Sequence, residues 1–116
     1  MTTRAGQPVP RRRPLTQADL RRLIADATLD AYDESEQRSG FFTMIDDHLA
    51  VPFETRVLGV SVIVTHVDLT PENGIVAVCR RTEWNQRVPI LDLSLPTPLP
   101  AGAEWIEAYR LGCHGG

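Results

Sequence analysis

Lysine is missing from this chain, and all twelve of its basic residues are arginines. These arginines are outnumbered by fifteen acidic residues, which leaves a net charge of −3. A domain that holds nucleic acid mainly through phosphate contacts is usually strongly basic. The charge balance therefore argues against nucleic acid as a partner and leaves cations open.

Cysteine is scarce as well, and Cys79 and Cys113 have neither the CxxC nor the cysteine–histidine spacing of a zinc site. Two reduced thiols fit a cytosolic chain, while a disulfide between them stays open. No apolar run approaches the ~20 residues of a membrane span. The arginine-containing start lacks the apolar segment of a signal peptide. We therefore expect a cytoplasmic protein without a membrane partner.

Motifs of catalysis and nucleotide binding are absent too. The chain has no GxGxxG, Walker A or GxSxG sequence. Its three histidines, His48, His66 and His114, are scattered, and none follows the spacing of an activated nucleophile and its base. The sequence therefore predicts a protein that is not an enzyme.

The chain of 116 residues has the length of one domain. Residues 1–14 carry three prolines and four arginines with little to bury, which predicts a disordered lead. We expect a single domain over residues 15–112 and a tail over residues 113–116.

Two helices are expected first. Thr16 with Asp19 three residues later is typical of a capping box. The apolar spacing that follows predicts an amphipathic helix to about Tyr32 or Asp33. A second helical pattern runs over residues 35–49, with a bend between the two helices because one straight helix would be out of scale.

Period-two alternation then replaces the helical period. A bend is expected at Gly59. Strands are predicted over residues 53–65 and 75–81, then a loop over 82–86, a strand over 87–95 and a short closing helix over 103–111. Helices grouped before strands indicate the α+β class. We expect an N-terminal helical hairpin, a small SH3-like, partly open antiparallel β-barrel and a short C-terminal helix, with a flat sheet under the hairpin as the alternative.

Carboxylates crowd the stretch from Asp30 to Phe53, in which Arg38 is the one lysine or arginine: Asp30, Asp33, Glu34, Glu36, Asp46 and Asp47. Oxygen ligands of this kind suit Ca²⁺, although no window satisfies the EF-hand pattern. A helix of about fourteen residues is ~20 Å long, so its two ends cannot share one ion. Two sites completed by loop carbonyls, Glu54 or Asp68 are possible. A solvated acidic face is the structural alternative.

Several longer runs support the calcium hypothesis: DAYDESEQ, GFFTMIDDHLAVPF, VDLTPENGIVAVCRR, PILDLSLP and GAEWIEAYR. Together they resemble a family of small bacterial calcium-binding proteins, of the cyanobacterial cytosolic type, over about Ala27 to Arg110. The resemblance implies a cytosolic buffer or weak sensor without EF-hands, with Ca²⁺ as its cofactor. The metal ligands that it implies are Asp33, Glu34, Glu36, Asp46 and Asp47.

A basic and aromatic group offers a second hypothesis. Arg80, Arg81, Trp84 and Arg87 surround the predicted loop, and such groups bind partners by stacking and charge. The chain would then be a non-enzymatic interaction module that binds a protein or nucleic acid through this loop. The structural alternative for Trp84 is an indole folded back on the barrel, since tryptophan is usually well buried.

Overall fold

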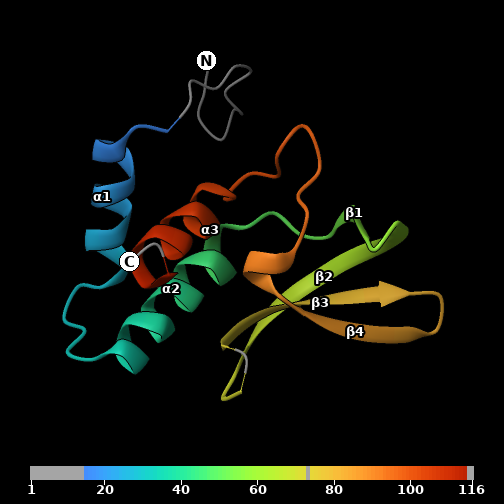
Figure 1. The fold of residues 1–116 in the computed structure, drawn as a ribbon, viewed down its shortest axis with the longest axis horizontal. Coiled ribbons are helices and arrows are strands. Elements are labelled where there is room, and N and C mark those ends of the chain that lie inside the picture. Colours follow the sequence, from blue (N-terminus) through green and yellow to red (C-terminus); the bar gives the residue numbers. More distant parts are fainter. Residues whose placement is uncertain (1–14, 73, 115–116) are drawn as a thin grey trace.

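The computed structural model describes residues 15–72 and 74–114. The predicted lead, residues 1–14, lies outside the described residues. The elements follow in the order α1 (Gln17–Ala27), α2 (Glu34–His48), β1 (Phe53–Val57), β2 (Val60–Thr70), β3 (Gly74–Arg81), β4 (Trp84–Pro89), a 3-10 turn (Ile90–Asp92), α3 (Glu104–Tyr109) and a π-helical turn (Arg110–His114). Figure 1 shows this order from blue to red.

Helix α1 begins with the predicted capping box. The Thr16 hydroxyl accepts the Asp19 N–H at 3.0 Å, and the Asp19 carboxylate accepts the Thr16 N–H at 3.0 Å. The predicted end at about Tyr32 is wrong, because α1 stops at Ala27. Asp30 has a φ of 65°, a left-handed conformation that a right-handed helix cannot contain and that aspartate tolerates.

Gly40 lies where α2 crosses the end of α1. A Cβ placed on Gly40 would lie 1.9 Å from the carbonyl oxygen of Ala27, far inside contact distance. Glycine lowers intrinsic helix stability by about 1 kcal/mol relative to alanine. Its presence inside α2 is explained by this close approach of two backbones.

The four strands form one antiparallel sheet in the order β1-β2-β3-β4. Leu58 and Gly59, with φ of 53° and 80°, make the turn between β1 and β2, as the expected bend at Gly59 requires. Helices, an antiparallel sheet and a short C-terminal helix confirm the α+β class. The SH3-like barrel and the helical hairpin stay predictions.

The last strand differs from its prediction. β4 covers Trp84–Pro89 and is followed by a 3-10 turn, so the expected strand over 87–95 is wrong. The expected loop over 82–86 shrinks to Thr82 and Glu83. Pro89 has no N–H for a ladder hydrogen bond, which ends the pairing there.

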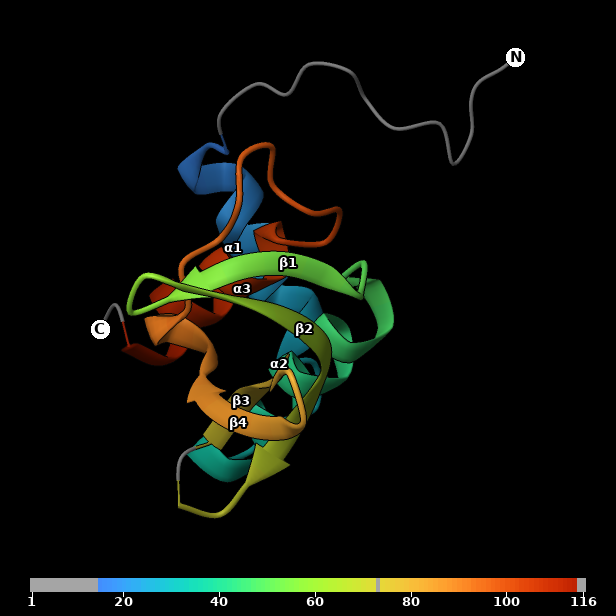
Figure 2. The same cartoon turned by 90° about the vertical axis from the view of Figure 1, so that its right-hand side faces the viewer.

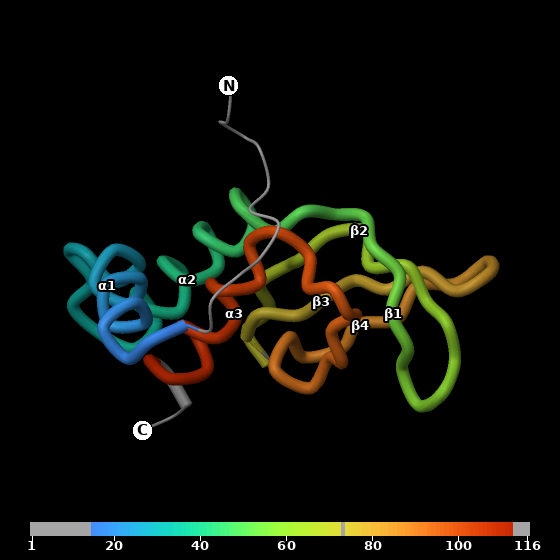
Figure 3. Tube along the Cα trace, turned by 90° about the horizontal axis from the view of Figure 1, so that it is seen from above, coloured from blue at the N-terminus to red at the C-terminus, as the bar shows by residue number. Residues whose placement is uncertain are grey.

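The elements stack in three layers. Helix α1 contacts α2 and α3, and α2 in turn contacts β2 and β3. In Figure 3 the helices occupy one end of the molecule, and the turn between β3 and β4 lies at the other. The second view shows how strongly the sheet twists beside the helices (Figure 2).

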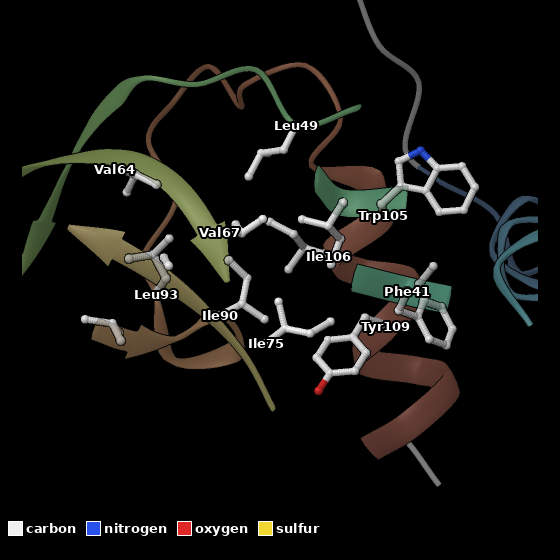
Figure 4. Packing of buried hydrophobic residues seen from close by; sticks show 14 of the residues in the cluster. Phe41, Leu49, Val64, Val67, Ile75, Ile90, Leu93, Trp105, Ile106 and Tyr109 are labelled. Atoms are coloured by element: carbon white, nitrogen blue, oxygen red, sulfur yellow. The ribbon is translucent and has the colours of Figure 1, made fainter. Parts of the chain in front are cut away.

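The core lies between the sheet and the pair α2 and α3 (Figure 4). Phe41 and Tyr109 bring these helices together, with ring centroids 5.5 Å apart. The fully buried large side chains are Phe41, Ile45, Ile75, Ile90, Ile106, Val64, Val76 and Cys79. The core therefore fixes the inner face of α2 and leaves its carboxylates outside.

Candidate functional site

Asp33 caps the start of α2. Its carboxylate accepts the backbone N–H of Glu36 at 2.8 Å. The carboxylate of Glu36 accepts in turn the backbone N–H of Tyr32. Because the first N–H groups of a helix have no intrahelical acceptor, Asp33 satisfies one such donor, that of Glu36. Glu36 in turn ties down the residue before the cap, Tyr32.

The helix dipole also favours the acidic residues at this end. Glu34 and Glu36 lie in the first turn of α2, where the partial charge is positive. Glu34 is exposed, as are its neighbours Asp33 and Glu36. Helix stability alone therefore accounts for the three acidic residues at the start of α2.

The end of α2 is different. Asp46 and Asp47 are exposed and adjacent in its last turns, where the partial charge of the helix is negative. The last four carbonyl groups of a helix also lack intrahelical donors. His48 is the basic residue of this last turn. Two carboxylates thus lie where the helix itself disfavours negative charge.

Backbone from the segment before α3 lies against this end of α2. Gly102 has a φ of 90°, and a Cβ on it would lie 2.2 Å from the carbonyl oxygen of His48. The N–H of Ala50 donates to the carbonyl of Ala101 at 2.8 Å. The His48 ring stacks on Trp105, with centroids 5.3 Å apart. The end of α2 is therefore held in a fixed position.

The structure does not bring the five predicted calcium ligands together. Asp33 and Asp46 are thirteen residues apart on one helix, which corresponds to about 20 Å. Over residues 15–72 and 74–112, no three histidine, cysteine or acidic side chains gather as a metal site. Asp68 lies 3.9 Å from the guanidinium of Arg87, and the completion of either end by Glu54 or Asp68 stays a prediction.

The turn between β3 and β4 carries the basic and aromatic group. Arg81 ends β3 and Trp84 begins β4, and the two residues are paired across the strands. The Arg81 guanidinium carbon lies 5.9 Å from the centroid of the indole. Trp84 is 67% exposed, so the alternative of an indole folded back on the sheet is wrong.

The sheet divides this group between its two faces. Directly paired residues share a face, and neighbours along a strand alternate. Arg81 pairs with Trp84, whereas Arg80 pairs with Asn85. Arg87 pairs with Val78, so Arg80 and Arg87 lie on the face opposite Trp84. The four predicted residues are therefore divided, with two on each face of the sheet.

A hollow of about 420 Å³ lies beside Trp84, lined by Arg81, Trp84, Asn85 and Gln86. Asn85 and Gln86 were missed because the sequence placed them in a loop, and a loop assigns no face to its residues. For Gln86 the correct signal is the two-residue spacing from Val88, which is buried in the core, back to Gln86 and Trp84. Asn85 lies between them on the other face and has no such signal.

Cys79 is a free thiol in the core. Burial raises the pKa of this thiol above its ordinary value of 9.0. A neutral, enclosed thiol is a poor nucleophile and a poor metal ligand at neutral pH. Cys79 is thus a packing residue and contributes no reactive group to either candidate site.

Within the described part of the chain, no helix is long and apolar enough to cross a membrane. Comparison of the sequence with protein-family models, with curated proteins and with solved structures gave no match.

Proposed function

We propose that this protein is a cytoplasmic, non-enzymatic calcium-binding protein, a buffer or weak sensor that uses carboxylates of α2. The resemblance described above motivates the proposal. The observation that carries it is the adjacent pair Asp46 and Asp47 at the end of α2, where the helix dipole leaves their charge uncompensated. A divalent cation bound at this end compensates the negative charge of the two carboxylates.

The chemistry of calcium supports a site with few carboxylates. Ca²⁺ takes six to eight oxygens, and backbone carbonyls and water count among them. The end of α2 offers two carboxylates beside the carbonyl groups of its last turn, of which that of Ile45 already accepts the N–H of Leu49 at 2.8 Å. Few charged ligands mean weak binding, which agrees with the modest net charge of −3.

The start of α2 is the weaker half of the proposal. Asp33, Glu34 and Glu36 remain proposed ligands, but Asp33 and Glu36 already accept backbone N–H groups. A cation bound there competes with the helix cap for the same oxygens. We therefore expect Ca²⁺ to occupy the end of α2 first.

Calorimetric titration with Ca²⁺ near physiological salt tests the proposal, together with amide shifts by NMR. We expect heat of binding and shifts around residues 46–50. Asp46→Asn with Asp47→Asn removes both signals, whereas Glu34→Gln with Glu36→Gln, a matched loss of two charges, leaves them. A wild-type protein without heat and without shifts contradicts the proposal.

The exposed Trp84 favours a second candidate, an interaction module that binds a protein partner at the turn between β3 and β4. In this candidate the strands form the predicted SH3-like, partly open barrel behind the helical hairpin. Capture of partners from lysate tests it, with Trp84→Ala against Leu99→Ala, another exposed apolar residue. If Trp84→Ala captures the same proteins as wild type, this candidate loses its site.

A further inference from the structure

β4 is the more open edge of the sheet. Among the described residues it pairs with β3 alone. Its residues Trp84 to Arg87 are all exposed, and since side chains alternate, both faces of the sheet are uncovered there. In β1, at the opposite edge, Thr55 is buried and its hydroxyl donates to the carbonyl of Ser94, so the segment around Ser94 packs against a face of β1. An open edge offers backbone N–H and C=O groups to an added strand.

The charge at this edge is positive in an acidic protein. Residues 80–87 contain three arginines and one glutamate, whereas the whole chain carries −3. Arg80, Arg81 and Arg87 are all exposed. Like charges placed opposite each other destabilise pairing, so this edge resists a second copy of itself. Arg80 and Arg81 attract and orient an acidic segment, while Arg87 already lies 3.9 Å from the carboxylate of Asp68.

The hollow beside Trp84 adds a place for an apolar side chain. Arg81 covers the indole from one side, and the ring stays 67% exposed. In strand addition, backbone hydrogen bonds provide affinity and pockets for alternate side chains provide specificity. The edge, the charge and the hollow belong to β4 and the turn before it. Figure 1 shows where this strand and turn lie in the fold.

We propose that β4 binds an extended acidic peptide segment as a fifth strand, with one apolar side chain of that segment in the hollow beside Trp84. The proposal rests on the interaction-module candidate and names the chemistry of its partner. A nucleic acid also stacks on an exposed indole. Its sugar-phosphate backbone, however, lacks the alternating N–H and C=O groups that pair with a strand edge.

The first experiment uses a capped synthetic peptide of about six residues, the length of an ordinary strand, that alternates glutamate with valine and has one central leucine. Trp84 emission shifts to the blue on binding, while Trp105, which is 7% exposed, serves as the internal reference. Amide shifts concentrate in residues 84–88. A peptide with lysine in place of glutamate does not bind.

Variants of the protein separate the aromatic contribution to peptide binding from the charged one. Trp84→Ala weakens peptide binding by about tenfold or more, as loss of a central aromatic anchor does. Arg81→Gln weakens it several-fold and reduces its dependence on salt. Arg110→Gln removes an exposed arginine of the turn after α3 and leaves binding unchanged. Equal effects of Arg81→Gln and Arg110→Gln overturn the role of local charge.

Peptides methylated on alternate backbone nitrogens test strand addition itself, because a paired strand directs every second N–H to its neighbour. Methylation of one set of positions abolishes binding, and methylation of the other set preserves it. Equal binding by both sets overturns the proposal, as does tighter binding of oligothymidylate than of the acidic peptide. If lysate capture depends on Trp84 but the acidic peptide fails to bind, this inference fails and the interaction-module candidate survives.

Discussion

The two ends of α2 carry the same chemistry in opposite surroundings. At the start, Asp33 and Glu36 accept backbone N–H groups, and Glu34 lies in the favourable field of the helix. At the end, Asp46 and Asp47 lie in the unfavourable field. The difference teaches that a carboxylate is explained by the backbone around it and not by the number of its acidic neighbours.

The acidic residues of this stretch therefore form two separate groups. Carboxylates crowded along a sequence look like one site, yet a helix places Asp33 and Asp46 about 20 Å apart. The start of α2 has a structural reason for its acidic residues. The end has none, and that is why the calcium proposal is concentrated on Asp46 and Asp47.

The largest expected effect is a loss of stability caused by moving α2 away from α1, which disturbs both ends of α2 together. Gly40→Ala places a Cβ 1.9 Å from the Ala27 carbonyl oxygen, so α1 and α2 must separate. Overpacking of this kind costs about 3 kcal/mol in the free energy of unfolding. Urea denaturation followed by circular dichroism measures the loss.

Ser39→Ala is the matched control for that variant. Ser39 precedes Gly40 and is exposed, so we expect its free energy of unfolding to stay within about 0.5 kcal/mol of wild type. A Gly40→Ala protein as stable as Ser39→Ala contradicts the close approach of the two helices.

The second prediction concerns the cap at the start of α2. Asp33→Ala removes the acceptor of the Glu36 N–H and lowers the free energy of unfolding by about 1 kcal/mol. Asp33→Asn keeps a side-chain oxygen at the cap and costs much less. Equal losses in the two variants, measured by urea denaturation, indicate that charge and not capping is what Asp33 contributes.

The smallest expected effect is a change in the free energy of unfolding that has opposite signs at the two ends of α2. Without calcium and at low ionic strength, Asp46→Asn and Asp47→Asn each raise the free energy of unfolding by about 0.3–1 kcal/mol. Glu34→Gln lowers it by a similar amount, because its charge lies at the favourable end. Both effects shrink in high salt. A change of the same sign at both ends contradicts the opposite action of the helix dipole on the two groups of carboxylates.

Local signals in the sequence predicted much of the fold. The capping box of Thr16 and Asp19, the second helix and the turn at Gly59 each depend on residues a few positions apart. The predicted end of the first helix failed because a left-handed residue, Asp30, carries no strong sequence signal. The prediction of the last strand failed because the alternation of apolar and polar residues continues after Pro89, where the chain instead forms a 3-10 turn.

The candidate sites were predictable as residues and not as geometry. The sequence identified Trp84 and its arginines, but strand register placed Arg81 on one face and Arg87 on the other. It identified the carboxylates of α2, but not which of them the helix already uses. The sequence thus determined helix starts, turns and periodicity, because hydrogen bonds and dihedral preferences act between near neighbours. Tertiary structure alone decided the approach of Gly40 to α1 and the exposure of Trp84, because each depends on how segments that are separate in the chain pack together.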